Sequence, residues 1–189
     1  MEPTEEEMHF ISDFHFGHRK IIEYAHRPFS SVDEMNETMI EKYNSAVGPN
    51  DPVMIVGDLA FGGPENFTKF ARRLNGVKTL IRGNHDKSIS DAEATNAGFV
   101  EVTYSKIMTF GKLKIGVAHF PFRKMGEMPG KYDISPNDCD VLVHGHVHQH
   151  WKVNKHSSGK LMINVSVEAI EYKPITLDDV HAIIKQQHE

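Results

Sequence analysis

The sequence predicts a single α/β domain on the strength of three observations. Short apolar runs that read as strands alternate with helical segments through the first half of the chain. The 189 residues are 39% hydrophobic and 25% charged, which is enough for one well-packed core. Because no linker, repeat or low-complexity segment divides them, we expect one domain over residues 1–189, with an acidic N-terminal tail at 1–7.

The first half of the chain alternates strands and helices. Pro28 ends the first, brief helix, because proline disfavours helical backbone in the residue before it. Ser31 and Glu34 have the spacing of a capping box and begin the second helix. Pro64 suits the first position of the third helix, where its missing N–H does no harm. The expected strands are 8–11, 53–56 and 78–81, and the expected helices are 19–25, 31–46, 64–74 and 91–97.

Strands predominate in the second half. Gly111 and Lys112 are typical of a hairpin turn between two of them. The segment 122–138, rich in glycine and proline, is expected to be a long surface loop, and the sequence leaves its role open. The expected strands are 99–104, 106–110, 113–118, 141–143 and 161–165, followed by a helix from about residue 176.

Composition excludes several classes of protein. The net charge of −5, from 26 acidic and 21 basic residues, argues against binding to long nucleic acids, which favours a basic face. No apolar run approaches the roughly 20 residues that span a membrane, and the acidic N-terminus is not a secretory signal. Cys139 has no partner for an internal disulfide, which fits a reducing cytoplasm, and we interpret it as a small buried hydrophobic residue.

Histidine is unusually common, with 13 residues in the chain. Four of them, His144, His146, His148 and His150, occupy alternate positions after the apolar run at 141–143. Each buried ring nitrogen needs a partner, and metal coordination satisfies several at once. For this motif alone, a solvated polar loop is an equally good interpretation.

The wider pattern favours a shared metal site. Five predicted strands each carry a ligand-type residue near their carboxyl ends, where sites form in α/β sheets. The donors are nitrogen and oxygen without thiolate, a set that suits manganese, iron or zinc. They are too many for one ion but enough for two if a carboxylate bridges, and two ions can act together in displacement at phosphorus. These candidate ligands are Asp13, His15, Asp58, Asn84, His119, His146 and His148.

In this order the motifs resemble those of the calcineurin-like metallophosphoesterase superfamily. They are DxH at 13–15, GD at 57–58, GNHD at 83–86, the lone His119, and GHxH at 145–148. The sequences HFGH at 15–18 and RPF at 27–29 are similar to those of small bacterial and phage phosphoesterases. The resemblance implies a four-layer α-β-β-α sandwich with two mixed β-sheets and a site at one edge of the sheets.

The resemblance also implies a role for each residue. One metal would be held by Asp13, His15, Asp58 and His148, and the other by Asp58, Asn84, His119 and His146. Asp58 would bridge the two ions, and a shared water, as hydroxide, would be the nucleophile. His85 would protonate the leaving oxygen, and Asp86 would either orient His85 or cap the following turn. We expect two divalent ions, Mn²⁺ first, with Fe, Zn or Ni as alternatives.

The expected function is hydrolysis of phosphodiester bonds in small, nucleotide-type substrates. His18, Arg27 and Arg123 are candidates for contact with the substrate phosphate, although arginine at the surface is the ordinary alternative. Competing functions are a phosphomonoesterase, a nuclease, and a non-catalytic scaffold on the same fold. The physiological substrate and the oligomeric state are left open by the sequence.

Overall fold

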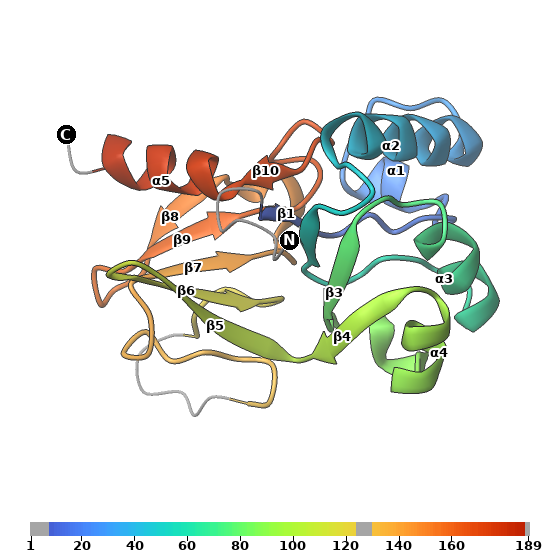
Figure 1. Ribbon diagram of the computed structural model, residues 1–189. Helices are drawn as coiled ribbons and strands as arrows, with labels where there is room; N and C mark the ends of the chain where they lie inside the picture. Colours follow the sequence, from blue (N-terminus) through green and yellow to red (C-terminus); the bar gives the residue numbers. More distant parts are fainter. Residues whose placement is uncertain (1–7, 124–129, 188–189) are drawn as a thin grey trace.

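The computed structural model of the protein describes residues 8–123 and 130–187 (Figure 1). The acidic tail expected at 1–7 and the centre of the loop expected at 122–138 lie outside the described residues. The described chain forms two five-stranded sheets with flanking helices. This confirms the α/β fold with two mixed sheets.

The first sheet has the strand order β10-β1-β2-β3-β4. Strands β1 to β4 pair in parallel, and the short β10 pairs antiparallel with β1. This parallel arrangement brings the carboxyl ends of β1, β2 and β3 to one edge. The strands are β1 (His9–Ile11), β2 (Pro52–Ile55), β3 (Val77–Ile81), β4 (Phe99–Thr103) and β10 (Ile175–Thr176).

The second sheet has the order β5-β6-β7-β9-β8. Its central strands β6, β7 and β9 are parallel, while β5 and β8 pair antiparallel at the two edges. The hairpin expected at Gly111 and Lys112 joins β5 to β6 and is confirmed. The strands are β5 (Ser105–Phe110), β6 (Leu113–Ala118), β7 (Val141–His144), β8 (Val153–Lys155) and β9 (Leu161–Asn164).

Four helices lie around the first sheet, and α5 runs alongside the second (Figure 1). Ser31 caps α2 as expected, since its side chain accepts from the Glu34 N–H at 3.1 Å. The Glu34 carboxylate, however, accepts from the N–H of Ser30 rather than Ser31, so the capping box is displaced by one residue. The helices are α1 (Ile21–Tyr24), α2 (Val32–Ala46), α3 (Pro64–Ala71), α4 (Asp91–Asn96) and α5 (Leu177–Gln186).

The main hydrophobic core draws on both sheets and on the helices. Along β7 the side chains alternate, because successive residues of a strand point to opposite faces. Val141 and Val143 belong to the main core, whereas Leu142 belongs to a smaller cluster with Phe122 and Cys139. Cys139 is therefore the buried hydrophobic residue that the sequence indicated.

The two sheets meet where β1 and β9 end. The Ser12 N–H donates to the Val165 carbonyl at 2.8 Å, and the Val167 N–H donates to the Ser12 carbonyl at 3.1 Å. This isolated bridge brings the chain after β1 next to the chain after β9. The strand ends that carry the predicted ligands therefore lie at one junction. No helix in the described ranges is both long and apolar enough to cross a membrane.

Candidate metal centre

The backbone at the junction adopts a conformation that L-residues rarely adopt. Eight described non-glycine residues have positive φ, and five of them are predicted metal ligands. Left-handed backbone turns the chain sharply after a strand. The conformational strain of such residues is found mainly at functional sites. The five are Asp13 (57°), His15 (50°), Asp58 (55°), His146 (71°) and His148 (48°).

Asp13 has one saturated oxygen and one that lacks a protein partner. Its Oδ2 accepts from the Ser12 hydroxyl at 2.6 Å, the Ser166 hydroxyl at 2.9 Å and the His146 N–H at 2.8 Å. Its Oδ1 is buried and has no hydrogen-bond partner among the residues that the structure describes. A Cβ at Gly145 would lie 2.3 Å from Oδ2, so glycine is needed for this close approach. A buried anionic oxygen without a donor requires a cation.

The two carboxylate oxygens of Asp58 also have different partners. Oδ1 accepts from the His85 N–H at 2.9 Å. Oδ2 lies 3.6 Å from His15 Nε2, 3.5 Å from His119 Nε2 and 4.0 Å from His85 Nε2. A Cβ on Gly83 would lie 2.1 Å from Oδ1, which explains the glycine in the GNHD motif. One carboxylate oxygen thus lies among three imidazole rings.

The His119 ring shows that this site needs positive charge. Its Nδ1 lies 2.8 Å from the Val56 carbonyl, which can only accept, so Nδ1 carries a proton. Nε2 then faces two acceptors, Asn84 Oδ1 at 3.1 Å and Asp58 Oδ2 at 3.5 Å. Burial opposes protonation, but the interactions with Asp58 and Asp13 prevail and raise the pKa of His119 to about 9. A metal ion would take the place of that second proton.

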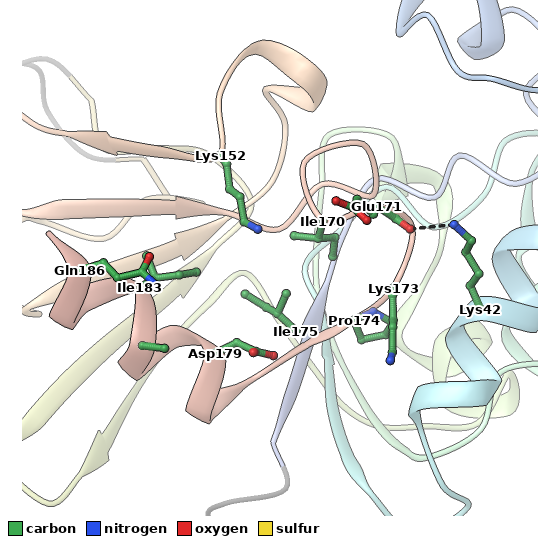
Figure 2. Close-up of a pocket in the computed structure, with 11 residues that line it drawn as sticks. Lys42, Lys152, Ile170, Glu171, Lys173, Pro174, Ile175, Asp179, Ile183 and Gln186 are labelled. Atoms are coloured by element: carbon green, nitrogen blue, oxygen red, sulfur yellow. Dashed lines mark hydrogen bonds between the residues drawn. The ribbon is translucent and has the colours of Figure 1, made fainter.

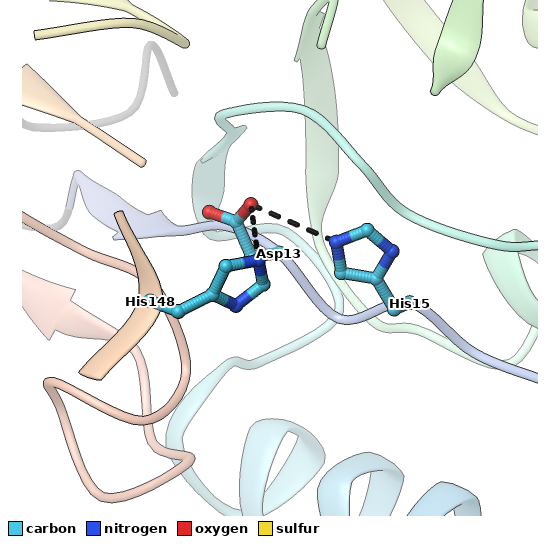
Figure 3. Close-up of side chains that lie close together, drawn as sticks. All are labelled: Asp13, His15 and His148. Atoms are coloured by element: carbon cyan, nitrogen blue, oxygen red, sulfur yellow. Dashed lines mark ion pairs between the residues drawn. The ribbon is translucent and has the colours of Figure 1, made fainter. Parts of the chain in front are cut away.

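His148 is held by an acidic residue that the sequence analysis missed. Its Nδ1 donates to Glu168 Oε1 at 3.0 Å, which directs Nε2 towards Asp13 Oδ1, 3.9 Å away. Figure 3 shows the imidazoles of His148 and His15 converging on Asp13, with His15 Nε2 also 3.9 Å from Oδ1. A carboxylate behind a ligating histidine is the usual arrangement in metal sites, where it fixes the ring and its tautomer.

The ligand atoms fit the dimensions of metal coordination. Two atoms bound at about 2.1 Å to one ion lie about 3 Å apart at right angles and about 4 Å apart when opposite. In three groups in the described part of the chain, the candidate ligand atoms all lie within 4.8 Å of one another, close to this spacing. The groups are Asp13–His15–His148, His15–Asp58–His85 and Asp13–Asp58–His119. Because the groups share Asp13, His15 and Asp58, these side chains form one continuous centre.

His146 and His85 are placed less simply. The His146 ring packs against His119 and Phe120, with centroids 5.3 Å and 4.5 Å away, and belongs to none of the three groups. The His85 side chain is 45% exposed at the mouth of the centre. It is thus more accessible than the buried His15 and His119.

Asp86 does not orient His85. It is fully buried, and its Oδ2 accepts from the N–H groups of Asp58 and Gly83, both at 2.8 Å. Its Oδ1 accepts from the Leu59 N–H at 3.3 Å. No hydrogen bond joins it to the His85 ring within the described residues. Asp86 instead fastens the loop after β2 to the loop after β3, which is closer to the alternative role in the turn.

Three residues were predicted to contact the substrate phosphate, and the position of Arg27 contradicts that prediction. Its side chain is fully buried and donates to the carbonyls of Asp13 and Phe14, both at 2.7 Å, and to Glu168 at 2.8 Å. Its role is to support the loop after β1. His18 is half-buried beside the centre, stacked on Phe61 at 4.4 Å.

Arg123 is exposed and lies on the segment before β7, where its Nε donates to Asp133. No described contact joins its side chain to the predicted metal ligands. The structure thus leaves a phosphate contact by Arg123 as a prediction.

The chain is similar to several known proteins over nearly all of its length. Over 186 residues the chain is 34% identical to an uncharacterized protein of Methanocaldococcus jannaschii, covering 95% of this chain and 92% of that protein. It is 24% identical over 202 residues to the Gene 66 protein of Mycobacterium phage L5, covering 95% of each. A crystal structure of a protein of unknown function from Aquifex aeolicus aligns with a TM-score of 0.69 and 25% identity, over 93% of this chain and 98% of that one.

The family described as the calcineurin-like phosphoesterase superfamily domain matches residues 7–167. This range contains all seven predicted ligands together with His85. The chain therefore belongs to the calcineurin-like phosphoesterase superfamily.

Proposed function

We propose that the protein is a two-metal phosphodiesterase that acts on small, nucleotide-type substrates. The observation that carries this proposal is the position of Asp58 Oδ2, which lies 3.6 Å from His15 Nε2 and 3.5 Å from His119 Nε2. A carboxylate so placed could belong both to a ligand set that contains His15 and to one that contains His119. When bound, two divalent cations supply charge for the phosphate and lower the pKa of a water molecule. The oxygen and imidazole donors favour Mn²⁺, with Fe, Zn or Ni as alternatives.

Each residue of the centre then has a proposed role in metal binding or proton transfer. One ion would be held by Asp13, His15 and His148 together with Asp58, and the other by Asn84, His119 and His146, also with Asp58. His85 can donate a proton to the leaving oxygen, because its ring is exposed at the mouth of the centre. Hydrolysis of a phosphodiester needs such a donor whenever the leaving group is a basic alkoxide. A phosphomonoesterase with the same centre is the second candidate.

Metal content and substrate preference test this proposal together. We expect two Mn²⁺ per chain by elemental analysis, and faster hydrolysis of bis-para-nitrophenyl phosphate than of para-nitrophenyl phosphate. The reverse preference would replace the diesterase with a monoesterase. Absence of hydrolysis by the manganese-loaded protein would favour the non-catalytic scaffold.

Two variants separate metal binding from proton donation. Asn84→Ala removes a neutral oxygen ligand, so it should weaken one metal and reduce turnover severely. His85→Ala should retain both metals and slow mainly the esters with basic leaving groups. Neither residue has positive φ, so alanine adds no backbone strain. Loss of metal from His85→Ala would make His85 a ligand rather than the acid.

A further inference from the structure

Two surface pockets have similar volumes but different positions. One, of about 600 Å³, lies between α2 and α5 and is lined by Lys42, Lys152 and Lys173 with Glu171 and Asp179 (Figure 2). None of its lining residues is a predicted ligand or a neighbour of one. The other, of about 630 Å³, is lined by Arg82 and Lys87, which lie on either side of Asn84 in the sequence. Because the second pocket lies closer in sequence to the predicted ligands, it is the better candidate for a substrate site, and we call it the tyrosine pocket.

The tyrosine pocket is connected to the metal centre by aromatic rings. The Phe120 centroid lies 4.5 Å from the His146 ring and 5.7 Å from the Tyr132 ring. Tyr132 in turn meets Tyr104 edge to face, with centroids 4.9 Å apart. Tyr104 lies between β4 and β5, where the chain passes from one sheet to the other. A half-buried aromatic path thus leads from the metal ligands into the pocket.

Positive charge lies beside these rings. Lys131 Nζ is 4.3 Å from the Tyr104 centroid and 5.1 Å from the Tyr132 centroid, and it donates to the Tyr104 hydroxyl at 3.2 Å. Lys87 is exposed on the same pocket. Arg82 is buried, and its charge is paired with Asp91 at 2.6 Å. The two lysines are therefore the cations available to a ligand.

We propose that the tyrosine pocket binds the nucleoside portion of the substrate, with a base stacked on Tyr132 or Tyr104 and Lys87 and Lys131 donating to the carbonyl oxygens of that base. Aromatic rings beside cations are how proteins hold single nucleotides without reading their sequence. Because the path starts at His146, a phosphodiester at the metal centre can extend its nucleoside along Phe120 into the pocket. This inference rests on the proposed function, since it names the group attached to the phosphorus that the centre attacks.

The test compares two esters with the same leaving group. They are the para-nitrophenyl ester of thymidine monophosphate and methyl para-nitrophenyl phosphate. The wild-type protein should prefer the thymidine ester, and Tyr132→Leu should reduce that preference about tenfold, the scale of one base–aromatic stack. Tyr132→Phe keeps the ring and should retain most of the preference. Lys131→Gln should also reduce it, whereas Lys112→Gln, at the exposed hairpin between β5 and β6, should not.

Direct binding gives a readout that does not depend on turnover. Calorimetric titration of thymidine monophosphate into the manganese-loaded protein should show binding that Tyr132→Leu weakens about tenfold. Urea unfolding of each variant checks the fold, and Tyr104→Leu provides a second variant if Tyr132→Leu is unstable.

The outcomes separate this inference from the proposed function. Nucleotide binding that depends on Tyr132, without hydrolysis of any ester, would support nucleoside binding in the tyrosine pocket and contradict the proposed phosphodiesterase activity. Hydrolysis of both esters with equal efficiency, together with nucleotide binding unaffected by Tyr132→Leu, would overturn the pocket alone. Preferential turnover of a phosphotyrosine peptide over the thymidine ester would also overturn it.

Discussion

Glu168→Gln should weaken metal binding and the fold together, because one carboxylate oxygen serves both. Glu168 Oε1 accepts from His148 Nδ1 at 3.0 Å and from Arg27 Nε at 2.8 Å. Both partners support the candidate metal centre: His148 as a predicted ligand, and Arg27 through the carbonyls of Asp13 and Phe14. Glutamine preserves the shape and one acceptor but removes the charge.

The expected magnitudes follow from burial. The Arg27 side chain is fully buried and that of Glu168 is 4% exposed, so their ion pair is hardly screened by solvent. Breaking such a pair costs about 3–5 kcal/mol, which we expect for Glu168→Ala. Glu168→Gln should lower the free energy of unfolding by about 1–2 kcal/mol, as a charged hydrogen bond becomes a neutral one. Losing the carboxylate behind His148 should weaken metal binding about 10- to 100-fold.

Two measurements separate these effects. Urea unfolding with a chelator present reports the fold without metal, and competition with a chromophoric chelator reports Mn²⁺ affinity. Glu171→Gln is the matched control, since Glu171 is exposed and the one hydrogen bond found for it among the described residues is from Lys42 to its backbone carbonyl. If Glu168→Gln bound Mn²⁺ as tightly as the control and unfolded at the same urea concentration, the role assigned to Glu168 would be wrong.

Two further predictions concern packing. Gly83→Ala should abolish binding of at least one metal, because its Cβ would lie 2.1 Å from Asp58 Oδ1. Gly159→Ala is the control, because there is open space around its Cβ. It should leave the metal content intact, although alanine at a φ of 86° lowers the free energy of unfolding by about 1 kcal/mol. Elemental analysis distinguishes them, and normal metal content in Gly83→Ala would contradict the steric argument. Burial raises the pKa of Cys139 to about 11, so iodoacetamide at pH 8 should alkylate it slowly in the folded protein and quickly in urea. Equal rates, followed by mass spectrometry, would show that the thiol is not protected.

The elements with strong sequence patterns were predicted well, and the short edge strands were missed. Strands β1, β2, β3, β6 and β7 lie where the apolar runs placed them. β8 and β10 contain three and two residues, too few for a period-two pattern to be visible. Their pairing is decided by neighbouring strands, which the local sequence does not contain. The α3 helix ends at Ala71, three residues earlier than expected.

The candidate metal ligands could be proposed from the sequence because each follows an apolar strand, and Glu168 follows the same rule. The predicted strand at 161–165 is followed by Ser166 and Glu168, spaced like Asp13 and His15 after β1. Applying the strand-end rule to this sixth strand would have identified both. Arg27 was misjudged for a different reason. Its buried position depends on Glu168, 141 residues away, and no pattern near Arg27 indicates that partner.

The left-handed backbone at five ligand positions affects how the centre can be altered. Asparagine, aspartate, histidine and glycine tolerate that conformation, whereas alanine and especially valine or isoleucine do not. An alanine scan of Asp13, Asp58 or His148 would therefore measure a lost ligand and a strained peptide at the same time. Asparagine is the cleaner replacement at the two aspartates, since it keeps the backbone tolerance and removes only the charge. The same constraint limits the substitutions that could remove a predicted ligand at these five positions without straining the backbone.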